Sequence, residues 1–140
     1  MQQPPTPHLF TTRVYLEDVD AGGIVYHANH LKYAERARAE LLKAGGVSHA
    51  EMLRIGGGIV VAALTIRYLR PLRLEETLVV STRIANIAAA SADLEQQISV
   101  DGDCAAVLNV GLVCLGPAGK PVRWPAAVRK ALARAEGQKT

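Results

Sequence analysis

Four stretches in the second half of the chain have the pattern of β-strands, and they constrain the fold more than any other feature. They cover residues 60–68, 78–85, 93–100 and 105–115; the first three alternate two sets of side chains, and the last is almost wholly apolar. Alternation of this kind predicts half-buried strands. Asp101-Gly102, before the last stretch, is a common hairpin turn. Four consecutive strands with tight turns favour an antiparallel meander whose apolar face needs a cover.

That cover is predicted over residues 28–44, which are followed by Gly45-Gly46, a typical helix C-terminus. At about 100° per residue, the apolar side chains of this segment fill one broad arc: Leu31, Tyr33, Ala34, Ala37, Leu41, Leu42 and Ala44. Arg38 falls inside this arc, three residues after Glu35. Their spacing favours an ion pair that is buried or lies at an interface.

The remaining segments complete an α+β chain. Ser48 and Glu51 are placed to cap a short helix. The predicted elements are a first strand over 9–17, a short helix over 48–54, and a terminal helix from Pro125 to about Ala135. No repeat or linker is visible, so we expect one domain over residues 1–140, with residues 1–8 as a flexible arm. The fold expected is one long helix wrapped by a curved antiparallel sheet.

Composition excludes several classes of function. The net charge of +3 is mild, and one Phe, one Trp and four Tyr are too few for a base-stacking platform, so no nucleic-acid partner is expected. No apolar run reaches membrane-spanning length and no signal peptide is visible, which predicts a cytoplasmic protein. Cys104 and Cys114 fall on one predicted strand, so we expect small core residues and neither a disulfide nor a metal site.

The segment 15–30 carries the strongest indication of chemistry. It contains three acids, two adjacent glycines and two histidines directly before the long helix. The N-terminus of a helix has free backbone N–H groups that stabilise negative charge. Asp20 precedes His27 by seven residues and can therefore face whatever binds there. This layout favours a reaction site for a polarised carbonyl group.

Four segments, in this order, resemble the hotdog-fold acyl-CoA thioesterases: residues 18–29, 35–42, 68–78 and 119–125. The likeness is to the branch with the 4-hydroxybenzoyl-CoA thioesterases and the small thioesterases encoded with the Tol–Pal envelope system. It implies a five-stranded antiparallel sheet around one central helix. It also implies hydrolysis of an acyl-CoA or acyl-carrier-protein thioester without a cofactor, coenzyme A being part of the substrate. The expected assembly is a homodimer or a dimer of dimers (a homotetramer) that pairs through strands, with sites between subunits.

The resemblance also implies roles for individual residues. Asp20 takes the place of the catalytic aspartate, as general base or nucleophile, and His27 that of the histidine where the helix begins. A backbone N–H near His27 would polarise the carbonyl group. Candidate substrate contacts are Tyr26, Gly58 and, for the phosphates of coenzyme A, Arg83. Leu16 departs from relatives that often have tyrosine at that position.

The sequence also allows other interpretations of these residues and of the function. Asp20 could only cap a turn, His27 could be held by local hydrogen bonds, and Glu35 is a competing carboxylate. The glycines at 56–58 form a flexible joint or let the backbone approach the acyl group. Two other functions are a non-catalytic hotdog interaction module in lipid or envelope metabolism and a hotdog dehydratase acting on acyl thioesters.

Overall fold

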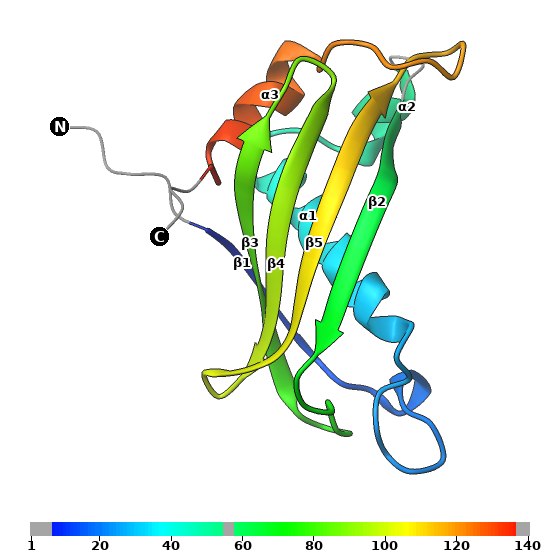
Figure 1. Ribbon diagram of the computed structural model, residues 1–140, viewed down its shortest axis with the longest axis vertical. Coiled ribbons are helices and arrows are strands. Elements are labelled where there is room, and N and C mark those ends of the chain that lie inside the picture. Colours follow the sequence, from blue (N-terminus) through cyan, green and yellow to red (C-terminus); the bar gives the residue numbers. More distant parts are fainter. Residues whose placement is uncertain (1–6, 55–57, 137–140) are drawn as a thin grey trace, which may run out of the picture.

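The computed structural model describes residues 7–54 and 58–136 and has an α+β architecture (Figure 1). Its five strands form one antiparallel sheet in the order β1-β3-β4-β5-β2. The strands are β1 (His8–Arg13), β2 (Gly58–Tyr68), β3 (Thr77–Ile87), β4 (Ser91–Val100) and β5 (Asp103–Leu115). The helices are η1 (Leu16–Asp18), α1 (Asn29–Ala44), α2 (His49–Arg54) and α3 (Ala126–Ala133). The predicted five-stranded sheet and the long helix are confirmed.

The prediction of a four-stranded meander is wrong for its first strand. Only β3, β4 and β5 follow one another in space, whereas β2 lies at the edge beside β5 and β1 lies at the opposite edge beside β3. The segment between β2 and β3 does not join them as a hairpin, because it pairs with the loop that precedes α1. Val25 N–H donates to Leu72 O at 2.8 Å, and Ile24 forms a bridge with Arg73. The chain therefore crosses from the edge strand β2 to β3, which lies beside the opposite edge strand.

The N-terminal segment also differs from the prediction. β1 ends at Arg13, and Leu16–Asp18 form a 3-10 turn where a continuous strand was expected. The first six residues of the predicted arm lie outside the described residues, but His8 already pairs with Thr82 in the sheet. The chain thus leaves the sheet early and turns toward the start of α1.

α1 covers one face of the sheet and buries the arc that the sequence indicates (Figure 1). Its residues Tyr33, Ala34 and Ala37 are at most 1% exposed and pack in one core with the inward side chains of the strands. α3 packs against α1 and β3 and extends this core with Val128 and Leu132. Leu31 and Ala44 are the exceptions, because both are exposed. Both cysteines lie on β5 and are free, Cys114 buried and Cys104 half-buried.

The expected ion pair between Glu35 and Arg38 does not form. Instead, Arg38 donates from Nη1 to Oε1 of Gln96 on β4 at 2.9 Å. Glu35 is exposed, and the ion pairs within residues 7–54 and 58–136 are Arg70–Glu76 and Arg83–Glu95. A partner across the core therefore holds Arg38, where helical spacing predicted one on its own helix. In the described part of the chain, no helix is long and apolar enough to span a bilayer.

Candidate functional site

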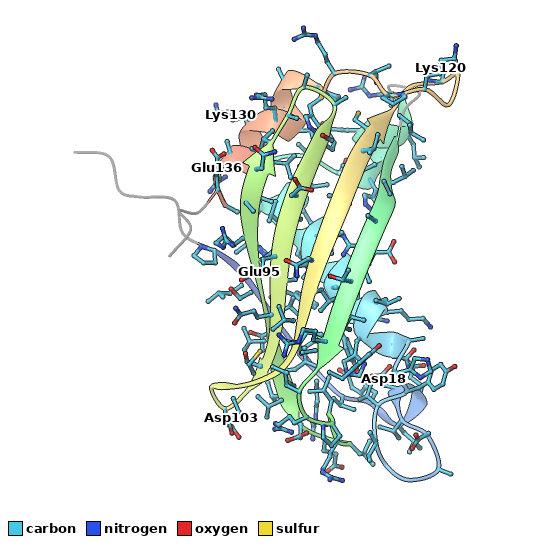
Figure 2. All side chains as sticks on the ribbon, viewed as in Figure 1. Asp18, Glu95, Asp103, Lys120, Lys130 and Glu136 are labelled. Carbon is cyan, nitrogen blue, oxygen red and sulfur yellow. The ribbon has the colours of Figure 1, made fainter. Side chains whose placement is uncertain are left out.

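The loop before α1 is anchored by Asp18, which lies beside the start of that helix (Figure 2). Asp18 is 7% exposed, and its Oδ2 accepts the N–H of Tyr15 at 2.9 Å. Its carbonyl oxygen accepts the N–H of Tyr26 at 3.1 Å and the side-chain amide of Asn29 at 2.8 Å. Burial, followed by the Asp18 carboxylate, raises the pKa of the Tyr33 hydroxyl. Asp18 thus fixes the path of the loop between Tyr15 and the first turn of α1.

Asp20 lies at the exposed tip of the same loop. Its Oδ1 accepts N–H groups from Gly22 at 2.9 Å and from Ile24 at 3.4 Å. Gly23 follows with φ of +77°, a conformation that glycine adopts without strain. One oxygen of Asp20 therefore caps the turn, as the structural interpretation of this residue expects. No hydrogen bond within the described segments engages the other oxygen, Oδ2, which can accept a proton or attack a carbonyl carbon.

The two limbs of the loop lie side by side, because Val19 and Val25 form an antiparallel bridge. Asp20 follows one end of that bridge and Tyr26 follows the other. The rings of Tyr26 and His27 are in contact, with centroids 4.4 Å apart, and both residues are exposed. The loop therefore places Asp20, Tyr26 and His27 at one end of the molecule.

α1 begins without a side-chain cap. The N-cap position is Ala28, whose side chain makes no capping hydrogen bond. Among the described residues, the N–H groups of His27 and Ala28 have no hydrogen-bond acceptor. Replacing a polar N-cap by alanine typically costs about 1 kcal/mol. Uncapped N–H groups at the positive end of a helix are suited to bind an oxygen that gains negative charge.

The peptide group between His27 and Ala28 is fixed by contacts to its carbonyl oxygen, opposite the Ala28 N–H. The His27 carbonyl oxygen accepts the hydroxyl of Tyr68 at 2.8 Å and lies 3.1 Å from Nδ1 of His30. Nδ1 must carry the proton for this second contact to be a hydrogen bond, which leaves Nε2 of His30 unprotonated. Because a peptide is planar, two donors on this oxygen also fix the direction of the Ala28 N–H.

His30 and Tyr68 are site residues that the sequence analysis missed. His30 is 3% exposed, and desolvation by burial lowers the pKa of its imidazole, so the ring is neutral at pH 7. It meets Tyr68 edge to face at 4.9 Å, and both line a cavity of about 340 Å³ together with His27. Tyr68 stands in one of the family-like segments, but its contact spans 41 positions, which no local pattern reveals.

The structure places two candidate contacts elsewhere. Gly58 begins β2, at the end of that strand opposite Tyr68. Arg83 lies on the face of the sheet away from α1, where it pairs with Glu95 at 3.5 Å; Figure 2 shows Glu95 midway along the sheet. Neither residue lies beside Asp20, Tyr26 and His27 of its own chain. Among residues 7–54 and 58–136, no three His, Cys, Asp or Glu side chains are grouped to bind a metal.

Known proteins that resemble this chain in sequence include thioesterases. Residues 14–132 match the thioesterase-like superfamily. The chain is 35% identical over 125 residues to the acyl-CoA thioesterase YbgC of Haemophilus influenzae, which covers 87% of this chain and 91% of that protein. It is also 35% identical over 106 residues to the acyl-CoA thioester hydrolase YbgC of Escherichia coli O157:H7, covering 75% and 79% of the two chains.

Solved structures agree. A probable thioesterase from Bartonella henselae superposes with a TM-score of 0.83 at 31% identity, over 86% of this chain and 100% of that one. SAV2348 from Staphylococcus aureus, solved in complex with CoA, has a TM-score of 0.89 over 100% of this chain and 92% of that one, but only 14% identity, and so shares the fold alone. The sheet order, the covering helix and these matches together show that the chain is a hotdog-fold member of the thioesterase-like superfamily.

Proposed function

We propose that this protein hydrolyses an acyl-CoA thioester at the start of α1. One observation carries the proposal. The same loop presents two N–H groups without acceptors, on His27 and Ala28, and a carboxylate, Asp20, that keeps one oxygen free of hydrogen bonds within the described residues. The names of the two YbgC relatives support the same reaction class.

In the reaction, the thioester carbonyl oxygen would accept the N–H groups of His27 and Ala28. A water molecule attacks the carbonyl carbon while its proton passes to Oδ2 of Asp20. The C–S bond then breaks and the thiolate of coenzyme A leaves; because a thiol has a pKa of about 8.5, the leaving group needs little help from an acid. Loss of one donor to such an oxyanion typically costs about 10²–10³ in rate.

A nucleophilic role for Asp20 is the alternative route. Its oxygen would attack the carbonyl carbon, the C–S bond would break, and water would then hydrolyse the mixed anhydride. After a single turnover in ¹⁸O-labelled water, label in the Asp20 carboxylate demonstrates the nucleophilic route, because water has then attacked Cγ of the anhydride. Label only in the released acid is expected for general-base catalysis but also when water attacks the acyl carbon of the anhydride. Formation of an Asp20 hydroxamate in the presence of hydroxylamine separates these two cases.

β2 supports the proposal that the protein works as a dimer or dimer of dimers. It is an eleven-residue edge strand with exposed apolar residues on both faces, including Val60 at 38% and Val61 at 46% exposure. A long apolar edge invites pairing with another strand. Antiparallel pairing of β2 with its copy would bring the Tyr68 end of one chain to the Gly58 end of the other. Gly58 would then reach a reaction site only across this pairing.

Arg83 is a candidate contact for the coenzyme A phosphates only from the outer face of the sheet, where its Nη2 lies 3.5 Å from Glu95. Tyr26 remains a candidate contact, since it is exposed beside His27. Whether the carrier is coenzyme A or an acyl carrier protein is settled by comparing the same acyl group on both carriers.

The decisive experiment measures thiol release from a panel of short, long and aromatic acyl-CoAs. The Asp20→Asn variant keeps an oxygen that can accept the N–H groups of Gly22 and Ile24, so the loop should persist. We expect the activity to fall by about 10²–10⁴, the usual contribution of a positioned acid or base, at an unchanged melting temperature. Equal activity of the variant would refute the role of Asp20, and Glu35 would be the next carboxylate to replace. Inertness of the wild type on every thioester would favour the interaction module.

A further inference from the structure

A second cavity lies on the flank of α1 that faces α2 and the edge strand β2. Its volume is about 180 Å³. Most of its lining is apolar, including Leu42, Ile59, Val61, Leu94, Leu112 and Leu132. Glu35, Arg38 and His49 are the polar side chains that reach it. A charged guanidinium in the wall of a small apolar cavity needs an explanation, because burial of a charge without a partner is costly.

Arg38 is held at this wall by a buried network. Gln96 is 0% exposed; its Oε1 accepts Nη1 of Arg38, and its Nε2 donates to Ala34 O and to Thr82 Oγ1, all three at 2.9 Å. Every hydrogen-bonding group of this amide except one oxygen lone pair is therefore used, and its orientation is fixed. The guanidinium is thus presented to the cavity in one position.

Arg38 has no ion-pair partner among the described residues of its own chain, although Glu35 lies near enough to favour its charged form. Within the described residues, no carboxylate oxygen lies within 4.0 Å of it, and Glu35 on the preceding turn is exposed. Burial lowers the pKa of Arg38, which means that its positive charge is already partly removed from water. A carboxylate that met the guanidinium here would form charge-assisted hydrogen bonds, which are about twice as strong as neutral ones.

The cavity would also face a reaction site if β2 pairs with its copy as proposed. Ile59 and Val61 line it at the Gly58 end of β2. Antiparallel pairing brings the Tyr68 end of the second copy, with its own His27, to this end of the strand. An acyl group bound at the α1 N-terminus of one chain can then extend into the cavity of the other.

On these grounds we propose that the cavity receives the far end of the acyl group and that Arg38 binds a carboxylate there. The substrate class is then the coenzyme A monothioesters of short dicarboxylic acids. A cavity of about 180 Å³ is smaller than the roughly 300–1,000 Å³ of sites for drug-sized ligands, and so admits only a few carbon atoms. This inference depends on the thioester hydrolysis proposed above.

The test compares substrates that are matched in shape. Monothioesters of the four- to eight-carbon dicarboxylic acids are assayed beside branched alkyl isosteres, in which an isopropyl group replaces the terminal carboxylate; 6-methylheptanoyl-CoA thus matches adipoyl-CoA. At one chain length we expect kcat/KM for the carboxylate to exceed that of its isostere by about tenfold or more, as a hydrogen bond to a charged group allows. A hydroxyl-ended substrate of the same length should give a smaller preference, since it lacks the negative charge.

Variants assign the preference to Arg38. Arg38→Met should abolish it, mainly through KM for the carboxylate substrate, while hydrolysis of the isostere continues. Arg38→Lys keeps the charge without the planar fork and should retain part of the preference, which keeps the test valid if the methionine variant melts early. Lys43→Met removes an exposed positive charge from the same helix and serves as the control; it should leave the preference unchanged.

The inference is overturned by a wild type that shows no carboxylate preference at any length, or by a folded Arg38→Met variant that keeps the preference. A preference for the hydroxyl-ended substrate over the carboxylate would also refute it. Failure of the proposed function looks different, because then no thioester in the series, charged or apolar, releases thiol.

Discussion

At the scale of single residues, the carbonyl oxygen of His27 is the most constrained atom of the candidate site. Tyr68 donates to it from the end of β2, and His30 donates from the first turn of α1. Both bonds act on the peptide whose N–H, on Ala28, faces the proposed oxyanion. We therefore regard Tyr68 and His30 as positioning residues, which act on the reaction through this peptide.

Removing one of these donors should slow the reaction without weakening binding. We expect Tyr68→Phe to lower kcat by several-fold, about the 1 kcal/mol of one hydrogen bond, with little change in KM. Tyr15→Phe is the matched control, because that side chain is exposed on the loop. His30→Asn retains a donor near the position of Nδ1 and should keep more activity than His30→Phe. If the asparagine and phenylalanine variants are equally slow, the Nδ1 contact has no positioning role.

The buried imidazole of His30 also predicts how stability depends on pH. Its pKa in the folded protein is lowered from the ordinary value of 6.5, chiefly by desolvation. Below that value the unfolded chain binds a proton that the folded chain resists, so stability falls as the pH drops from about 7 toward 5. The melting temperature of His30→Asn should fall less steeply over this range. Part of the slope will remain, because burial lowers the pKa of His8 as well. An identical slope in the two proteins would contradict the prediction.

At the scale of elements, the contact between the end of α1 and α3 depends on Gly45. A Cβ atom there would lie 2.8 Å from Cα of Ala131 and closer still to its Cβ. Gly45→Ala should therefore push the helices apart and destabilise the protein by about 1–3 kcal/mol, the usual cost of overpacking. Gly58→Ala is the control for stability, because nothing lies within 4 Å of its added Cβ. Chemical denaturation measures both, and equal midpoints would show that the two helices separate without cost.

The sequence predicts elements better than it predicts their neighbours. α1 and the β4–β5 hairpin follow from local periodicity and a two-residue turn, so their bounds agree closely with the prediction. The position of β2 at the edge of the sheet does not follow from any local pattern. Strand order depends on the path of the segment between β2 and β3, and hydrogen bonds between this segment and the loop before α1 determine that path.

The same limit applies to the site. The acidic loop and the start of the helix are contiguous, so Asp20, Tyr26 and His27 could be proposed from sequence. Arg38 could be singled out as unusual, but its partner Gln96 is 58 positions away, and helical spacing pointed to Glu35 instead. The roles of Tyr68 and His30 depend on the contact between the end of β2 and the loop, which the sequence does not reveal.

At the scale of the whole molecule, charge is divided between the two ends. Figure 2 shows Asp18 and Asp103 toward one end, and Lys120 and Lys130 toward the other, where Glu136 also lies. The segment 117–135 contains five Lys or Arg and no acid, whereas the loop over 15–28 contains three acids and no Lys or Arg. An antiparallel arrangement of two copies would set the basic end of each beside the acidic end of the other, which favours association through complementary fields.

The final prediction concerns that assembly and its link to activity. Ala62 is exposed midway along β2, at the irregularity that the pairing with β5 skips, so a lysine there leaves the sheet of one chain intact. In an antiparallel pair of β2 strands, the two lysines would face each other near the two-fold axis and repel. We expect Ala62→Lys to shift the protein to a smaller species in light scattering and to lose thiol release together with the assembly, because in the proposed pair the second chain completes the binding site for the acyl group. Leu9→Lys, an exposed apolar position on the opposite edge strand, should change neither. A monomeric Ala62→Lys protein with full turnover would show that each chain carries a complete site, and dissociation by Leu9→Lys alone would move the interface to β1.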